Sequence, residues 1–187
     1  VSRRANPVTD GWAMASMGLI GANLRTAYHE PTNAAAREAM MLGAMLGGLA
    51  FSNASVALVH GMSRPIGAHF HVPHGLSNAM LLPAVTRFSV GEAPVRYAAA
   101  ARQIGFAGAQ DDTDAACAKL VEGLAALNAE LEVPSPRAYG IDAAAWEDRL
   151  EIMAEQALAS GSPANNPRVP DKAEIVALYR AVYSANA

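Results

Sequence analysis

The stretch Gly48–Phe88 decides the fold, and it runs GLAFSNASVALVHGMSRPIGAHFHVPHGLSNAMLLPAVTRF. The Ser-Asn dipeptide at 52–53 indicates the end of one helix and a cap for the next, which we expect from about Ala54 to Ile66. Gly67–Val72 predicts a loop. Pro73 stands where a further helix can begin, because the fixed φ of proline suits the first turn of a helix. The pattern therefore predicts two helices joined by a short loop.

The rest of the chain has the same helical patterning on both sides of this stretch. We expect one helix from Pro7 to about His29 and a second one, capped by Thr32 or Asn33, through Phe51. No segment shows the period-two alternation that marks a half-buried strand. Further helices are expected over residues 73–88, 94–104, 114–131, 146–158 and 173–183. We therefore predict an all-α fold, a bundle of about seven or eight helices that forms a single domain over residues 1–187.

The composition narrows the class of protein. Hydrophobic residues make up 52% of the chain and charged residues only 17%, which is apolar for a soluble domain. The net charge of −3 comes without a basic stripe, so nucleic acid is not an expected partner. Cys117 is the single cysteine, which excludes a disulfide framework within the chain and fits the cytoplasm. The opening residues VSRRANP have no apolar core and do not resemble a signal peptide.

A membrane segment is the main alternative for the middle of the chain. Ala39–Val59 has no charged residue and is long enough to span a bilayer. Polar Ser and Asn at positions 52, 53 and 55 interrupt the run, and no cluster of Lys or Arg flanks it. A buried pair of helices explains the run as well, so no membrane partner is expected.

Histidines give the strongest chemical signal, because four of the five lie between His60 and His74. His60 falls on a predicted helix and His74 begins the next, so the short loop can bring both imidazoles close together. Imidazole is a ligand for Zn, Fe, Ni or Cu, but a catalytic metal site usually has three protein ligands. No Asp or Glu occurs between Glu38 and Glu92, so an acidic ligand has to come from elsewhere. The alternative that these are structural histidines near a turn stays open.

The same stretch closely resembles the metal-binding signature of the iron-containing alcohol dehydrogenases. The matching features are AFSNA, the His-Gly-Met that begins at His60, and the Pro-His-Gly about fourteen residues later. Two further segments are similar to that family: SRRANPVTDGWAMASMGLI near the start and NNPRVP near the end. The resemblance therefore covers nearly the whole chain.

This resemblance implies the helical C-terminal domain of a two-domain enzyme, with a dehydroquinate synthase-like fold. Such enzymes transfer a hydride between a nicotinamide cofactor, NAD or NADP, and a small alcohol or aldehyde. A divalent metal, usually Fe²⁺ and in some members Zn²⁺, acts on the alcohol as a Lewis acid. By resemblance His60 and His74 are the last two metal ligands, and Phe51 lines the substrate pocket.

Two departures from the family pattern affect this prediction. The family's remaining ligands, an Asp-x-x-x-His pair, and its nucleotide-binding domain do not occur in these residues, so we expect the 187 residues alone to be inactive. Arg64 stands where many relatives have a further His. It is a candidate for binding a cofactor phosphate or an acidic substrate group, and the alternative is a cation that stabilises a helix end.

Two other functions remain as alternatives. One is a helical metal-binding or interaction module without catalysis, and the other, within the family, is an enzyme similar to maleylacetate reductases. The intact Pro-His-Gly-Leu at 73–76 favours the alcohol dehydrogenase branch. Because apolar surface would be exposed where the nucleotide-binding domain is missing, we also expect the chain to form homo-oligomers.

Overall fold

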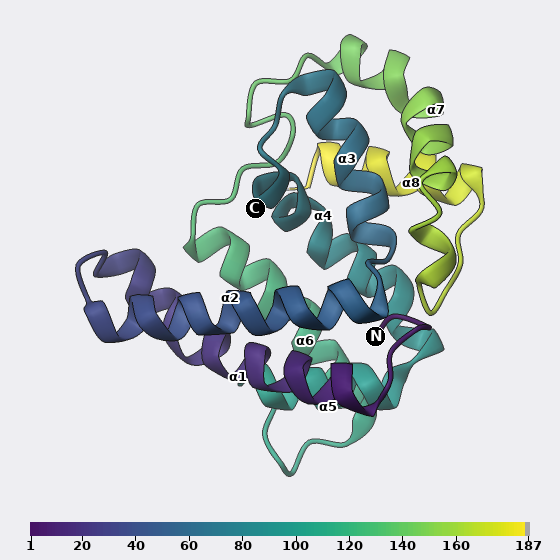
Figure 1. Ribbon diagram of the computed structural model, residues 1–187. Helices are drawn as coiled ribbons and strands as arrows, with labels where there is room; N and C mark the ends of the chain where they lie inside the picture. The colour runs from purple at the N-terminus through teal and green to yellow at the C-terminus, as the bar shows by residue number, and fades with distance from the viewer. Residues whose placement is uncertain (186–187) are drawn as a thin grey trace. The chain divides into compact units, whose positions relative to one another are not determined.

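The computed structural model describes residues 1–185, and these residues form eight α-helices, two short 3-10 helices and no strand. This confirms the prediction of an all-α fold. The helices are α1 (Pro7–His29), α2 (Ala34–Ala54), α3 (Leu58–Phe70), α4 (His74–Ser89), η1 (Val90–Glu92), α5 (Pro94–Ile104), α6 (Thr113–Glu130), α7 (Ala143–Ala159), η2 (Pro163–Asn165) and α8 (Lys172–Tyr183) (Figure 1).

The predicted break at residues 52–53 is wrong, because α2 continues to Ala54. Asn53 does not cap a new helix; its side-chain amide donates to the carbonyl of Leu49 one turn earlier, which keeps it inside the helix. The break falls instead at Ser55, whose φ of 61° is left-handed. The next helix is correspondingly displaced and continues past Gly67, which had been expected in the loop, to Phe70.

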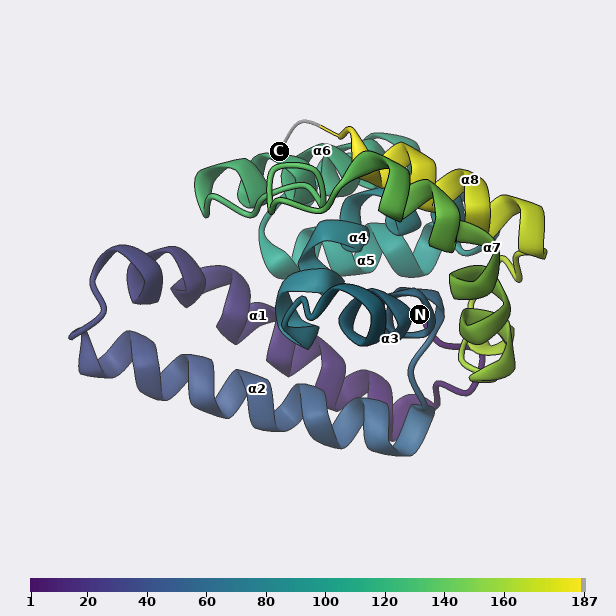
Figure 2. The same cartoon turned by 90° about the horizontal axis from the view of Figure 1, so that it is seen from above.

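The chain forms two compact units, which we call the first unit (Val1–Ser55 and Ala93–Gly123) and the second unit (Val56–Glu92 and Leu124–Ala187). The sequence pattern did not indicate this division. In the first unit, α1 and α2 run side by side along most of their length (Figures 1 and 2). The glycines of α2 allow this close approach: a Cβ at Gly43 would lie 2.8 Å from Cγ1 of Ile20, and the Ser16 hydroxyl donates to the Gly43 carbonyl at 2.7 Å.

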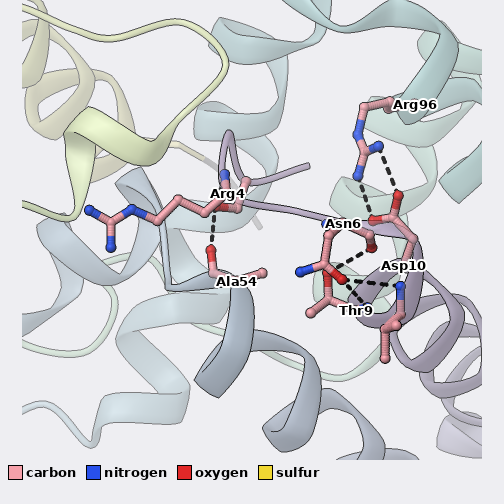
Figure 3. A network of polar contacts seen from close by, with 8 residues as sticks. Arg4, Asn6, Thr9, Asp10, Ala54 and Arg96 are labelled. Carbon is pink, nitrogen blue, oxygen red and sulfur yellow. Dashed lines mark hydrogen bonds and ion pairs between the residues drawn. The ribbon is translucent and has the colours of Figure 1, made fainter.

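Polar contacts fix the beginning of α1 within the first unit (Figure 3). Asn6 caps the helix, with its side chain accepting from the amides of Val8 and Thr9. Asp10 receives two hydrogen bonds from the guanidinium of Arg96, at 2.7 and 2.9 Å, which join α1 to α5. The start of the chain is therefore held by capping and charge rather than by a large apolar core.

The second unit contains the main hydrophobic core. Trp146 of α7 is 1% exposed and packs against the rings of Phe70, Tyr179 and Tyr183. The Tyr179 hydroxyl donates to the main-chain carbonyl of Met62 at 2.7 Å, which ties α8 to α3. Other side chains in this core that are fully buried come from α3, α4, α7 and α8: Leu58, Met62, Ile66, Leu81, Leu150, Met153 and Ile175.

The membrane alternative concerns α2 and α3. Within residues 1–185, no single helix is both long and apolar enough to cross a bilayer. Only α2 and α3 taken together, across the break between them, reach the required length and composition.

Candidate metal centre

His60 and His74 lie side by side in the second unit. His60 is in the first turn of α3 and His74 is the first residue of α4. Their ring centroids are 5.3 Å apart, with 55° between the ring planes. The connection can be this short because His71 adopts a left-handed conformation, with φ of 55°, and reverses the chain directly after Phe70.

The position of His60 depends on how α3 is anchored. Leu58, Met62 and Ile66 follow one another at intervals of four residues, so they share a face that is fully buried in the core of the second unit. His60 lies on another part of the helix surface and is half-buried. The hydrophobic face thus fixes the rotation of α3, and the rotation sets where the His60 side chain can reach.

The loop around η2 supports the same end of α3. The Asn165 side-chain amide donates to the main-chain carbonyl of Val56 at 3.1 Å, just before the helix starts. Pro163 packs so closely on Gly61 that a Cβ there would lie 2.9 Å from the proline Cδ. The NNPRVP segment, which the sequence linked only to a family resemblance, therefore has a structural role next to His60.

The surroundings of His60 favour its neutral imidazole. Burial, together with the positive charges that His74 and Arg64 can carry, lowers the pKa of His60 below its usual value. A neutral imidazole has the free lone pair that a metal ligand needs. The pair therefore offers two nitrogen donors of the kind that iron and zinc accept.

The described residues provide only part of a metal site. Among residues 1–185, no group of three or more His, Cys, Asp or Glu side chains is placed to hold one ion. His60 and His74 fit two coordination positions, and a complete catalytic site requires further ligands.

Polar contacts to His74 involve two residues that the sequence analysis missed. The Ser63 hydroxyl lies 3.3 Å from Nδ1 of His74 and also donates to the main-chain carbonyl of His60. The side-chain nitrogen of Asn78 lies 3.1 Å from Nε2 of His74. Helical spacing could have indicated both residues, because Ser63 is three positions after His60 and Asn78 is four after His74.

The other candidate residues lie elsewhere. Arg64 is exposed on α3 and donates to the hydroxyl of Ser162 at 3.2 Å, a contact within the protein. A role of Arg64 in cofactor binding stays a prediction. Phe51 lies on α2 in the first unit with 49% of its surface exposed, and its role in a substrate pocket also stays a prediction. His69 contacts Gln156 at 2.9 Å and is not part of the pair.

The family follows from comparison with known sequences. The sequence model described as "Fe-containing alcohol dehydrogenase family, C-terminal" matches residues 1–183. The chain belongs to this family. It is 35% identical over 183 residues to 1,3-propanediol dehydrogenase of Klebsiella pneumoniae, covering 98% of this chain and 46% of that protein. It is 32% identical to the NADPH-dependent butanol dehydrogenase of Clostridium saccharobutylicum, covering 95% of this chain and 45% of that protein.

Two solved structures of oxidoreductases have the same fold over this chain. A crystal structure of 1,3-propanediol oxidoreductase matches 97% of this chain and 47% of its own, with a TM-score of 0.90 and 36% identity. Maleylacetate reductase from Rhizobium sp. strain MTP-10005 matches 97% of this chain and 47% of its own, with a TM-score of 0.78 and 26% identity. The chain thus spans about half the length of the relatives it matches, and it corresponds to their helical C-terminal domain.

Proposed function

We propose that this chain is the metal-binding part of an NAD- or NADP-dependent dehydrogenase that interconverts small alcohols and aldehydes. The observation that carries the proposal is the pair His60 and His74, with ring centroids 5.3 Å apart, in the stretch that resembles the metal-binding signature of the family. The Klebsiella and Clostridium relatives, named for propanediol and butanol, support a small alcohol as the substrate. The name of the Clostridium enzyme also supports a nicotinamide cofactor.

In this proposal each residue of the centre has a limited role. His60 and His74 would hold a divalent metal, iron or zinc, that supplies Lewis-acid chemistry to the alcohol group when bound. The core under α3 keeps His60 in place, and burial lowers the pKa of its imidazole, which favours the neutral form. Phe51 is proposed to line the substrate pocket and Arg64 to contact the cofactor.

Metal titration tests the proposal most directly. Fe(II) and Zn(II) would be titrated into the 187-residue chain and into a longer protein that includes a nucleotide-binding domain upstream. We expect tight binding only in the longer protein. His60→Ala should weaken it by more than the roughly 10–100-fold that loss of an outer-shell partner costs, because a ligand itself is removed.

His29→Ala is the matched control, since His29 is an exposed histidine at the end of α1 in the first unit. The His29→Ala protein should bind metal with the same affinity as the unchanged protein. Equal affinity in the His60→Ala protein would refute the metal centre. Turnover of an alcohol with NAD by the 187 residues alone would refute the assignment of the cofactor to another domain.

The alternatives predict different results from the same proteins. A non-catalytic metal-binding module predicts tight metal binding by the 187-residue chain and no turnover in either form. The fold is shared with a maleylacetate reductase, so reduction of maleylacetate in preference to aldehydes would favour that branch. The homo-oligomeric state and the cytoplasmic location stay predictions.

A further inference from the structure

Both ring nitrogens of His74 have a polar contact. Nε2 lies 3.1 Å from the side-chain nitrogen of Asn78, and Nδ1 lies 3.3 Å from the hydroxyl of Ser63. The two contacts differ in their surroundings, because the one to Ser63 is partly buried and the one to Asn78 is exposed.

These contacts determine where the proton of a neutral His74 ring resides. The Asn78 amide is oriented with its nitrogen toward Nε2, and because an amide nitrogen only donates, we assign Nε2 as the acceptor that carries the lone pair. The ring proton is then on Nδ1, and it donates to the Ser63 oxygen. The hydroxyl of Ser63 in turn donates to the main-chain carbonyl of His60 at 3.3 Å. Along this series each donor faces one acceptor, whereas the amide oxygen of Asn78 is buried and has no hydrogen-bond partner among the described residues.

The hydroxyl of Ser63 contacts both members of the pair His60 and His74. Ser63 is fully buried, on α3 and one turn after His60. Its hydroxyl therefore contacts the backbone of one proposed ligand and the side chain of the other. A buried hydroxyl that makes such contacts orients a metal-binding imidazole and selects which nitrogen is free to bind.

We propose that Ser63 is a positioning residue that holds His74 with its proton on Nδ1 and its Nε2 lone pair available for the metal. This inference rests on the proposed function of His60 and His74. Asn78 then has a second, opposing role. Its amide lies at the Nε2 lone pair, so the side chain must rotate away before Nε2 can bind a metal.

Ser77 offers a close control for Ser63. It is also a fully buried serine, and its hydroxyl donates to the main-chain carbonyls of His74 and Ser63, at 3.0 and 3.4 Å. It belongs to the same pair of helices but has no contact with the His74 ring among those described. Ser77→Ala thus removes the same chemical group without changing the contact to Nδ1.

Nitrogen-15 NMR of the metal-free 187-residue chain reports the tautomer directly, independent of activity. At a pH where the ring is neutral, we expect the His74 signals of the Nδ1–H form. Ser63→Ala should shift the ring toward the Nε2–H form, and Ser77→Ala should leave it unchanged. An Nε2–H ring in the unchanged protein, or the same tautomer in all three proteins, would overturn the proposal.

Zn(II) affinity in the longer protein tests the consequence for the metal. Ser63→Ala should weaken binding by about 10–100-fold and Ser77→Ala by much less. Asn78→Ala should strengthen Zn(II) binding by about fivefold, because the metal then no longer has to displace the hydrogen bond between Asn78 and Nε2. Equal affinities for the two serine variants would overturn the positioning role. If the His60→Ala protein binds Zn(II) as tightly as the unchanged protein, the proposed metal centre is refuted. The NMR measurement does not depend on that result, because it tests only whether Ser63 sets the tautomer of His74.

Discussion

The two units of this chain bury their residues in different ways. The second unit has a core of large side chains in which Trp146 and Tyr179 are at most 1% exposed. The first unit joins α1 to α2 through small residues: a Cβ added at Gly43 would lie 2.8 Å from Cγ1 of Ile20, and one added at Gly47 would lie 3.1 Å from the Ser16 hydroxyl. The first unit thus achieves packing through close backbone approach, and the second through side-chain volume.

The difference is clearest on α2. This helix exposes several large apolar side chains: Met41 at 74%, Leu42 at 44%, Met45 at 55%, Leu49 at 40% and Phe51 at 49%. These residues belong to the uncharged run that the sequence analysis weighed as a membrane segment. Hydropathy measures how apolar a segment is, but it does not distinguish side chains that form a core from those that stay exposed. The proposed ligands are both in the second unit, where the core fixes the helices that bear them.

The largest expected effect comes from emptying the core of the second unit. Trp146→Ala should lower the free energy of unfolding by about 3–5 kcal/mol, because a buried indole leaves a cavity among Phe70, Tyr179 and Tyr183. Met41→Ala on α2 should change it by less than about 0.5 kcal/mol, since that side chain is 74% exposed. Urea unfolding followed by circular dichroism measures both. Similar losses in the two variants would remove the contrast between the units.

A second substitution at Trp146 separates volume from polarity. The indole Nε1 is buried and makes no hydrogen bond in the structure. Trp146→Phe keeps an aromatic ring and removes this unpaired donor, so it should cost much less than the alanine variant, under about 1.5 kcal/mol. A cost equal to that of Trp146→Ala would mean that the core needs the full volume of the indole and that a smaller aromatic ring cannot replace it.

The next effect tests close backbone approach in the first unit. A Cβ at Gly21 of α1 would lie 2.4 Å from the main-chain oxygen of Ile104, which cannot move as a side chain can. Gly21→Ala should therefore lower stability by about 1–3 kcal/mol. Gly11, in the same helix, has nothing within 4 Å of an added Cβ, so Gly11→Ala should raise stability by up to about 1 kcal/mol through helix propensity. Thermal unfolding that gave both variants the same sign would contradict this account.

Much of the fold could be predicted from sequence, and the errors have a physical cause. Pro7 and Pro94 begin helices as expected, because proline without an N–H suits a first turn. The end of α2 was predicted too early because Asn is a common capping residue, whereas the side-chain amide of Asn53 donates to the carbonyl of Leu49 within the helix. The true break at Ser55 uses a left-handed conformation that non-glycine residues rarely adopt, so no residue type marks it.

At the candidate centre, the closeness of the two proposed ligands could be predicted from the sequence more readily than the contacts around them. Concentrated histidines and a helix–loop–helix pattern predicted that His60 and His74 could come within a few ångströms, and their ring centroids are 5.3 Å apart. Ser63 and Asn78 lie one helical turn after His60 and His74, a spacing that could have indicated them, but only the structure shows that both contact the His74 ring. Whether the pair binds a metal stays a prediction, which the titration with His60→Ala decides.

The smallest expected effect concerns the ion pair between Asp10 and Arg96 in the first unit. The hydrogen bonds from Arg96 lower the pKa of Asp10 below its usual value of 3.8, so the pair stabilises the folded chain above that pH. This contribution is lost as the pH falls from about 3.8 through the lowered value, because the unfolded chain then binds more protons. Both side chains are more than a third exposed, at 38% and 43%, so a double-mutant cycle with Asp10→Asn and Arg96→Gln should give a coupling below about 1 kcal/mol. The coupling should shrink in 1 M salt and vanish at low pH, whereas the cost of Trp146→Ala should hardly depend on salt. A coupling energy that does not change with salt would show that the first unit shields this ion pair from solvent. The two units would then differ less in how they bury their residues than the exposed fractions indicate.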